Sequence, residues 1–501
     1  MAKNAFFLTV ASVGQKLLSF VYFLLLAKFL QPEKTGVYSA ALTLVTTFSV
    51  IADLGVPPVV IRDVAKDPTG ARGLIRRALA VKLPATLLAI PMAVGASFLL
   101  GYEADARLLV LLAGGILVSD SLSAFFYGVL RGLQQLSFEA IGMFTGQVLT
   151  LAAGGLALLL HPTLPTLVLT LTLGSAFNAV LSAVRVGKAL GWRTLLPLWD
   201  AAGMRAVAVT AFPFFLAATF VKLYSTMDIQ FLKVLLGNAA VGLYSVAYKF
   251  TYAFQFLPLA FVAALYPGMS ALAGAKDADG LGRLFDRALR YMLLLAVPLA
   301  FGLSAISDRL VRLVDASYAP AAPVLALLAF ALLPSFLDFP IGSLLNATGR
   351  QAAKTMVFGL TLVVNAALNF LLIPRFGLMG AAAASVASLA FLVTAGSRFI
   401  PTIIQGYQFR RAGRIALPIF LSGVAMYAAA RGLSTLPFAS NVFALVVTVC
   451  GAAVVYVGLL FLTRAASMED VRALRALLRR SPHAARVGNA ETGTPHAPKV
   501  S

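Results

Sequence analysis

A six-residue phrase occurs twice in this chain and constrains its fold more than any other feature. Gly36–Ala41 reads GVYSAA, and Gly242–Ala247, 206 residues later, reads GLYSVA. Lys66-Asp67 returns in the same order as Lys276-Asp277, at an offset of 210. The offset grows slowly, as it does when loops gain residues. The two halves are therefore predicted to be copies of one structural unit.

Composition places the chain in a membrane. Sixty per cent of its residues are hydrophobic and 12% are charged, whereas soluble domains carry about 25% charged residues. Apolar stretches of ~20 residues recur from end to end, and each is long enough to cross ~30 Å of hydrocarbon. The first, Ala5 to Leu30, is too long for a cleavable signal and lacks a small-residue cleavage site, so we expect it to be the first span.

Side chains that ligate metals are few and scattered. Cys450 is the only cysteine, and two of the three histidines lie in a polar tail. A disulfide within the chain is excluded, and neither a metal site nor a cofactor is expected. The net charge of +21 is better explained by lysines and arginines on the cytoplasmic side of a membrane than by a nucleic acid partner.

The hydropathy pattern predicts an all-α polytopic membrane protein with fourteen spans. They lie near residues 5–30, 37–61, 78–100, 107–130, 137–160, 164–188, 206–236, 239–268, 289–311, 320–345, 353–373, 377–404, 414–432 and 441–463. With the N-terminus inside, most of the 40 lysines and arginines fall on the cytoplasmic side, as the positive-inside rule requires. Both termini are therefore expected in the cytoplasm.

Repeat and spans together predict the domain organisation. Spans one to six and seven to twelve form the two copies, and because six is even, both copies enter the membrane in the same direction. We expect an N-terminal six-helix lobe at 1–190, a C-terminal six-helix lobe at 204–405, two further spans at 412–463 and a cytoplasmic segment at 464–501. Membrane proteins built from two repeated halves are typically transporters with the site between the halves.

Three cytoplasmic segments have the pattern of amphipathic helices. Asp67 and Asp277 can each cap a helix at equivalent places in the two copies. In the tail, Ser467 and Asp470 have a capping-box spacing, followed by an apolar stripe and several arginines. This basic helix is expected to lie on the anionic lipids of the inner leaflet, as an anchor rather than a docking site.

Two lysines inside predicted spans are the strongest candidates for a binding site. Lys16 lies near the middle of span one and Lys222 near the middle of span seven, 206 residues apart. They are equivalent in the repeat and are expected to face each other across its axis. A lysine at mid-membrane costs roughly 2.5–3.5 kcal/mol and usually faces a cavity or a partner. Two opposed lysines would bind an anion, most plausibly a phosphate or pyrophosphate, although snorkelling or pairing with a carboxylate is the alternative.

Asp228 and Lys249 are expected at matching depths in spans seven and eight. A salt bridge between the two helices would follow. Structural pairing and a gating or ion-coupling role are both consistent with this arrangement.

Asp120 and Asp338 lie singly in spans and are candidates for carrying coupling ions. Asn178, Asn365 and Asn369 fit helix–helix hydrogen bonds better than ligand contacts. Pro213 and Pro258 are expected to bend spans seven and eight. Gly142-x-x-x-Gly146 predicts close helix packing.

Signatures of enzymes are missing. The chain contains no Gly-x-x-x-x-Gly-Lys-Ser/Thr loop, so ATP hydrolysis by that route is not expected. Asp277-Ala278-Asp279 resembles a metal-binding motif of glycosyltransferases, but it lies in a short loop where helix capping explains it better. The chain is therefore not expected to be an enzyme.

Each half of the chain contains several short motifs. In the first half they are Phe29–Ser39 (FLQPEKTGVYS), Asp53-Leu54-Gly55 and Arg62-Asp63. In the second half they are Pro213, Asp228, Gly242–Ser245, Ala247 and Tyr266-Pro267. These motifs resemble the bacterial polysaccharide flippase family of the multidrug/oligosaccharidyl-lipid/polysaccharide exporter superfamily, which includes the O-antigen flippases. The resemblance covers roughly residues 5–405 and is specific for the superfamily rather than for a substrate.

The resemblance implies two six-helix lobes around a cavity that opens alternately to either side of the bacterial cytoplasmic membrane. The implied substrate is a polyprenyl-pyrophosphate-linked oligosaccharide for surface polysaccharide, with polysaccharide polymerase machinery as a further partner. A peptidoglycan-precursor flippase and a cation-coupled multidrug exporter of the same superfamily are the alternatives. A membrane glycan polymerase or ligase is the alternative from a different class, but the short external loops speak against it.

Overall fold

The structure, a computed structural model, describes residues 2–434 and 442–465 of the chain. Every regular element in these two segments is helical. Twelve helical segments in them are long and apolar enough to cross a membrane, judged by length and composition. The prediction of an all-α protein with many membrane spans is therefore confirmed.

The helices follow the two halves of the chain. The first half forms α1 (Ala2–Asp53), α2 (Val56–Lys66), α3 (Ala71–Leu99), α4 (Ala104–Gly132), α5 (Leu136–Leu160) and α6 (Leu164–Leu190), followed by the 3-10 turn η1 (Trp192–Leu195). The second half forms α7 (Ala201–Leu236), α8 (Asn238–Tyr252), η2 (Ala253–Gln255), α9 (Phe256–Gly274), α10 (Ala278–Ala305), α11 (Ser307–Val314), η3 (Ala316–Ala321), α12 (Ala322–Leu328), η4 (Ala329–Ala331), α13 (Leu332–Ala347), α14 (Gln351–Phe376), α15 (Leu378–Ser397) and α16 (Ile400–Ile403). The last two described helices are α17 (Phe409–Ser434) and α18 (Val442–Leu462).

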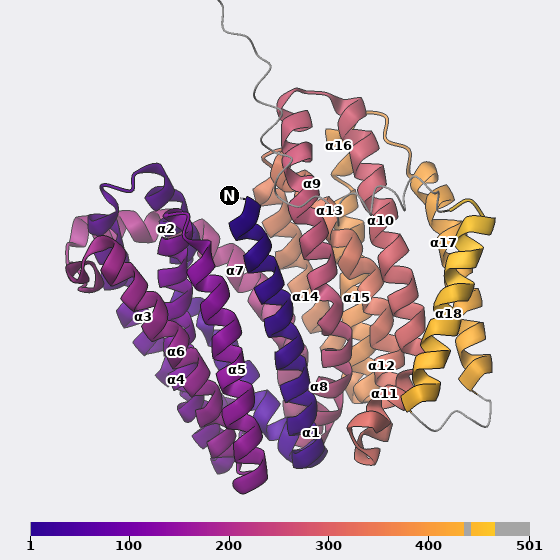
Figure 1. Ribbon diagram of the computed structural model, residues 1–501, viewed down its shortest axis with the longest axis horizontal. Coiled ribbons are helices and arrows are strands. Elements are labelled where there is room, and N and C mark those ends of the chain that lie inside the picture. The colour runs from indigo at the N-terminus through magenta and orange to yellow at the C-terminus, as the bar shows by residue number, and fades with distance from the viewer. Residues whose placement is uncertain (1, 435–441, 466–501) are drawn as a thin grey trace, which may run out of the picture.

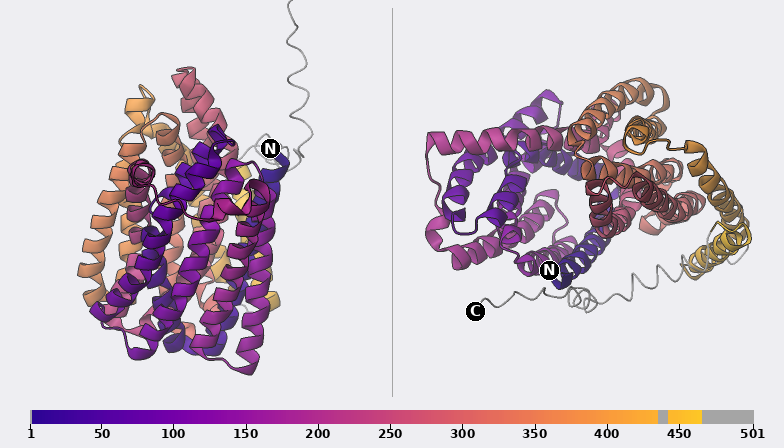
Figure 2. Two further views of the ribbon diagram at one scale, coloured as in Figure 1. Left: turned by 90° about the vertical axis from the view of Figure 1, so that its left-hand side faces the viewer. Right: turned by 90° about the horizontal axis from the view of Figure 1, so that it is seen from above.

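Figure 1 shows the helices of the first half and those of the second half as two groups side by side. α17 and α18 lie at the outer edge of the second group, where both contact α10. α1 packs on α3, α4 and α5 of its own group and on α8 of the other. α7 likewise contacts α2 and α3 in the first group and α14 in the second. α1 and α7 therefore join the two groups around the middle of the molecule, as the view from above shows (Figure 2).

Two faces of the molecule are used as reference below. The proximal face carries α2, the N-terminus and the turn between α9 and α10, and is uppermost in Figure 1. The distal face carries the bend of α1 at Gln31 and the turn between α7 and α8 at Gly237.

Two of the fourteen predicted spans are not separate long helices in the structure, so twelve candidate spans are found in the described residues. The first two predicted spans belong to one element, α1, which bends at Gln31 (φ 60°) before Pro32. The predicted span at 239–268 is divided by η2 into α8 and α9, just before Pro258, so the expected break near this proline is found.

The predicted end of the second span at residue 61 is wrong. α1 ends at Asp53, because Leu54 (φ 45°) and Gly55 (φ 68°) have left-handed backbone conformations that no helix continues. Residues 56–66 form a separate amphipathic helix, α2, with four buried valines on one side. The turn at Leu54 and Gly55 also exposes carbonyl groups that become part of the site.

Of the two expected capping aspartates, Asp277 caps a helix as predicted, whereas Asp67 ends α2 and α3 begins only at Ala71, after Gly70. Asp277 caps α10 and accepts a hydrogen bond from the Gly280 amide at 2.8 Å. Asp67 accepts the corresponding bond from the Gly70 amide at 3.0 Å, just before α3. α3 and α10 are each long enough to cross a membrane, so neither is a separate loop helix. The predicted tail helix from Ser467 lies outside the described residues.

Candidate functional site

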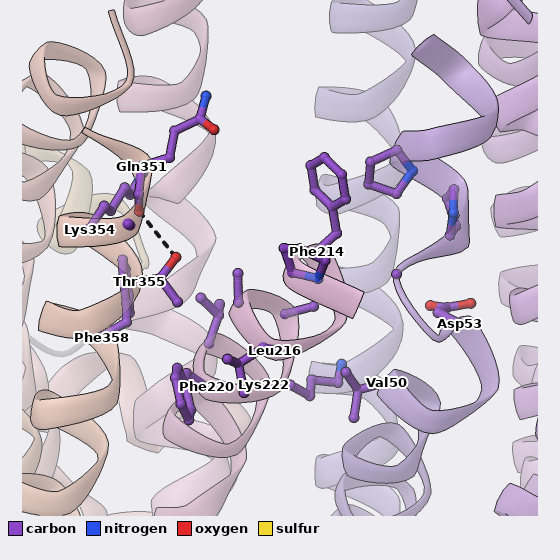
Figure 3. Close-up of a pocket in the computed structure, with 18 of the residues that line it drawn as sticks. Val50, Asp53, Phe214, Leu216, Phe220, Lys222, Gln351, Lys354, Thr355 and Phe358 are labelled. Carbon is purple, nitrogen blue, oxygen red and sulfur yellow. Dashed lines mark hydrogen bonds between the residues drawn. The ribbon is translucent and has the colours of Figure 1, made fainter. Parts of the chain in front are cut away.

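A cavity of about 1170 Å³ lies between the two halves. Its walls come from the end of α1 and the start of α2 in the first half, and from α7 and the start of α14 in the second. Most of the lining is apolar, and its charged residues are Asp53, Lys222 and Lys354. Figure 3 shows α7 between α14 on one side and α1 on the other. The cavity is thus placed where the repeat predicted a site.

Asp53 organises one wall of this cavity. Lys82 on α3, with a fully buried side chain, donates to Asp53 Oδ1 at 2.7 Å and to the Ala52 carbonyl oxygen at 3.1 Å. Ser121 on α4 donates to the same carboxylate oxygen at 3.0 Å. The Ala52 carbonyl is free to accept because α1 ends at Asp53 and the chain turns away. One carboxylate therefore ties three helices together and compensates a buried ammonium.

Gly55 allows α7 to approach this wall. A Cβ at Gly55 would lie 2.4 Å from the Phe215 amide nitrogen and 2.5 Å from the Ala211 carbonyl oxygen, both on α7. Contacts this short exclude any side chain. The Asp53-Leu54-Gly55 motif thus has two physical roles: it places the carboxylate, and it allows helices from the two halves to meet.

Lys222 faces the first half from α7. Figure 3 shows its side chain extending toward Val50 on α1. The charges of Asp53 and Asp120 both act on this ammonium. Asp120 is exposed although it lies within α4, and its carboxylate accepts a hydrogen bond from Ser175 on α6. An exposed carboxylate that interacts with Lys222 points toward the interior of the molecule rather than toward lipid.

Lys16 is not among the residues that line the cavity. Its side chain in α1 is partly exposed, and no carboxylate of the described chain lies within ion-pair distance of it. The expected opposition of Lys16 and Lys222 in one cavity stays a prediction. The second lysine of the lining is Lys354, which the sequence reasoning did not single out because it was counted with the basic residues at the membrane surface.

Lys354 reaches from α14 to α13. A Cβ at Gly342 would lie 2.7 Å from its ammonium nitrogen, so the glycine leaves room for the lysine. The charge of Lys354 acts on Asp338, four residues before Gly342 on α13. Asp338 therefore has a cation nearby, whereas the sequence had suggested that it stands alone.

The expected salt bridge between Asp228 and Lys249 is not formed. Asp228 accepts hydrogen bonds from Asn369 at 2.7 Å, from the Tyr244 hydroxyl at 3.0 Å and from Ser385. The Lys249 ammonium instead lies 5.0 Å above the ring of Phe23 on α1. Tertiary packing brings neutral donors from α8, α14 and α15 to Asp228, which helix depth alone could not reveal.

The amide side chains and the glycine pair behave as expected. Asn369 bonds Asp228, and Asn365 donates to Ser388 at 3.2 Å. Asn178 on α6 accepts from the Tyr127 hydroxyl at 2.9 Å. A Cβ at Gly142 would lie 2.9 Å from Asn178 Oδ1, and one at Gly146 would lie 2.2 Å from its Nδ2. The two glycines therefore allow α5 to pack closely on α6.

At the distal face the two halves are in direct contact. A Cβ at Gly36 would lie 1.7 Å from the Asn238 carbonyl oxygen, and one at Gly242 would lie 1.9 Å from the Pro32 carbonyl oxygen. The buried tyrosine Tyr102 has its hydroxyl 2.7 Å from Gln230 Oε1 on α7. Tyr318, also buried, has its hydroxyl 2.9 Å from Thr35 Oγ1 on α1. The halves are therefore joined at the distal face and enclose the cavity nearer the proximal one.

The arrangement of two helical groups around a largely apolar cavity with three charged residues is shared with a solved membrane protein. The structure of the "Lipid II flippase MurJ, inward closed conformation" superposes with a TM-score of 0.72 at 14% sequence identity, covering 94% of this chain and 99% of that one. At this identity the likeness establishes the fold.

Sequence comparison identifies the family. The family model described as "Polysaccharide biosynthesis protein" matches residues 1–273, and the model named "MatE" matches residues 213–371. The chain belongs to the polysaccharide biosynthesis protein family.

Two curated relatives come from Haloferax volcanii. The "Probable low-salt glycan biosynthesis flippase Agl15" is 24% identical over 38% of this chain and 41% of its own length. The "Probable flippase AglR" is 27% identical over 39% of this chain and 44% of its own length. The chain thus spans less than half the length of these two relatives.

Proposed function

We propose that this protein is a flippase that moves a polyprenyl-pyrophosphate-linked oligosaccharide across the membrane by alternating access. The observation that carries the proposal is the cavity between the halves, which contains Lys222 and Lys354 and is enclosed by direct contact of the halves at the distal face. Family membership supports a role in polysaccharide biosynthesis. The names of the two relatives, both called probable flippases, support a transporter rather than an enzyme.

Lys222 is the group best suited to bind the anionic head of the substrate. The charges of Asp53 and Asp120 act on its ammonium, although among the described residues it forms no ion pair with either. An incoming phosphate or pyrophosphate would draw the ammonium away from these carboxylates and become its counter-ion. Asp53 keeps Lys82 as its partner at 2.7 Å, so the exchange leaves no buried charge without compensation.

Lys16 is proposed to take part when the cavity changes shape. It lies on α1, which joins the two groups of helices and moves against α8 if the halves rock. According to this proposal, Lys222 and Lys354 contact the anion in the conformation described here. Lys16 contacts the anion in another conformation of the protein. Apolar lining residues such as Phe214 and Phe220 leave space for sugars and for the first part of the lipid.

The proximal face is proposed to be cytoplasmic, in a bacterial inner membrane. The positive-inside pattern supports this orientation, with both termini inside. In that orientation the cavity receives its substrate from the inner leaflet, and separation of Gly36 from the α8 backbone and of Gly242 from Pro32 opens the outward path. A polysaccharide polymerase on the outer side would then use the translocated unit.

Asp228 is proposed to couple transport to an ion or proton. Its carboxylate lies among Tyr244, Ser385 and Asn369, and Asn369 Oδ1 is buried without a hydrogen-bond donor. Oxygen atoms gathered in this way suit a small cation, and the carboxylate can also take a proton. Asp120, Asp338 and Lys249 are secondary candidates for gating, because each carries charge within the interior.

The alternatives differ in what the cavity should bind. A peptidoglycan-precursor flippase would use the same anion chemistry with a different glycan. A multidrug exporter for cations would need net acidic walls, whereas the lining has two lysines and one aspartate. The cavity therefore favours an anionic substrate.

The experiment uses a bacterium in which this protein is the only route for its glycan. Surface polysaccharide is compared between wild type, Lys222→Ala, Lys354→Ala and the Lys16→Ala/Lys222→Ala double variant at matched protein levels. The exposed Lys188 at the end of α6 provides the control, Lys188→Ala. We expect export to fall at least tenfold in Lys222→Ala, with the lipid-linked unit accumulating in the inner leaflet. Normal export in the double variant would reject the lysine site, and an unchanged glycan on deletion of the protein would reject the flippase function.

A further inference from the structure

A second cavity, of about 300 Å³, lies away from the central one, between α10, α13, α15 and α17. None of its lining residues is shared with the central cavity. Its walls are almost entirely aliphatic and aromatic, and include Leu293, Leu337, Ile341 and Phe420. The proposed transport function does not use this space.

The polar groups of this second cavity are all near the proximal face. Asp286 accepts a hydrogen bond from the Tyr407 hydroxyl at 2.9 Å and lies 3.6 Å from the Arg411 guanidinium. The Tyr407 ring packs edge-on against Phe285 and Phe409. These contacts hold the segment between α16 and α17 over one end of the cavity. The other end, at Leu293 and Phe420, is apolar.

Arginines are concentrated around the polar end. Five exposed arginines are neighbours in sequence of lining residues, namely Arg287, Arg398, Arg410, Arg411 and Arg414. Among the lining residues themselves, Asp286 is the one with a charge. The proximal end of the cavity therefore lies in an arginine-rich part of the chain, with Arg411 in contact with the lining through Asp286, while its interior is apolar.

A basic proximal end and an apolar interior match the head group and one acyl chain of an anionic phospholipid. Lining residues extend along α17 from Phe409 to Phe420, a distance of roughly 16 Å at 1.5 Å per residue. A volume of about 300 Å³ suits part of one unbranched acyl chain. A long polyprenyl chain with a methyl branch on every unit is a poorer fit. Basic pockets between membrane helices on the cytoplasmic side are typical sites for anionic head groups.

We propose that this cavity is a binding site for an anionic phospholipid, with one acyl chain between α10 and α17 and the phosphate at the arginines of the mouth. The lipid would fill the space between α17 and the helices of the second half, and so fix α17 and α18 against α10. The inference is independent of the transported substrate, because it concerns a different cavity.

Gly413 offers a way to block the cavity without disturbing the fold. It lines the cavity, and a Cβ there would meet no atom within 4 Å. Gly413→Leu should therefore place a side chain where the acyl chain would lie. Gly458→Leu on α18 is the matched control, because Gly458 is also helical and open but lies outside this cavity. Helix content and elution volume of the full-length variants show whether both fold.

The full chain is purified in mild detergent, and phosphatidylglycerol is titrated while bound lipid is counted by native mass spectrometry. Phosphatidylcholine of the same chains is titrated in parallel. We expect wild type and Gly458→Leu to retain one phosphatidylglycerol that Gly413→Leu lacks. We expect Arg410→Gln and Arg414→Gln each to weaken binding roughly fivefold. Equal retention in Gly413→Leu and wild type would overturn the proposal, as would equal binding of the two lipids or a polyprenyl lipid occupying the site instead.

Discussion

Gly36 and Gly242, which are 206 residues apart and equivalent in the repeat, pack reciprocally against each other's helices. A Cβ on Gly36 would meet the Asn238 carbonyl oxygen at 1.7 Å, and a Cβ on Gly242 would meet that of Pro32 at 1.9 Å. The repeated phrase found first in the sequence is therefore the contact between the two copies. It joins α1 and α8 where the molecule is closed.

Gly36→Ala and Gly242→Ala should each force the two halves apart at the distal face. Overpacking of this kind costs about 1–3 kcal/mol, and because opposing backbone atoms cannot rotate away, we expect the upper part of that range. The measurement is the thermal unfolding midpoint in detergent. Gly155→Ala on α5 is the control, since a Cβ there meets nothing within 4 Å. Equal midpoints for Gly36→Ala and Gly155→Ala would contradict the close contact.

Tyr102→Phe and Tyr318→Phe should favour opening of the distal face. Each removes a hydroxyl that bonds across the halves, at 2.7 Å to Gln230 and at 2.9 Å to Thr35. At about 1 kcal/mol per hydrogen bond, the open population should rise roughly fivefold in each variant and more in the double one. Spin labels on the two sides of the distal face, in a Cys450→Ala background, would report the distance distribution. Tyr456→Phe, whose hydroxyl bonds within the second half at 3.2 Å to Leu294, should leave that distribution unchanged.

Asp53→Asn should destabilise the protein more than Lys82→Met. The first change leaves the fully buried Lys82 ammonium without its partner at 2.7 Å, which costs about 3 kcal/mol or more, whereas an apolar replacement of the lysine leaves no buried cation. The double variant Asp53→Asn/Lys82→Met should recover most of the loss. Unfolding midpoints of the three variants form the test, and a double variant less stable than Asp53→Asn would refute the pairing.

Asp228→Asn should separate ion coupling from folding. The amide keeps the size of the carboxylate and can still accept from Tyr244, but it has no charge for a cation or proton. We expect folding close to wild type and at least a tenfold loss of glycan export. Tyr38→Phe is a useful comparison, because Tyr38 is the repeat equivalent of Tyr244 and its partner Tyr22 occupies the position of Asp228. If Asp228 couples transport to an ion, glycan export should fall in Asp228→Asn and not in Tyr38→Phe. Equal export in these two variants would argue against coupling at Asp228.

Much of the architecture could be read from patterns along the chain. The length of the apolar stretches predicted membrane helices. The repeated phrases predicted that the two halves of the chain are copies of one unit. The helix cap at Asp277 was also recognisable, because a cap depends on a residue three positions away. Asn365 and Asn369 were correctly assigned to helix–helix bonds, since a buried amide in a membrane requires partners.

The partners of the charged residues could not be read in the same way. Depth in the membrane suggested that Asp228 would meet Lys249, but depth leaves rotation about the helix axis undetermined. Lys354 was missed because its charge near a helix start resembles an ordinary surface lysine, and only the space at Gly342 reveals where its ammonium goes.

By itself, the sequence determined that this protein is a membrane-embedded pair of helical repeats, because hydrophobic length and repetition are properties of the chain alone. Tertiary structure decided the surroundings of each charged residue. Asp53 pairs with Lys82, Asp228 accepts hydrogen bonds from three neutral donors, and Lys222 lines the cavity. The physical reason is that a charge inside a membrane must be compensated by whatever group is nearest in space, and that group comes from another helix whose rotation and tilt are set by packing.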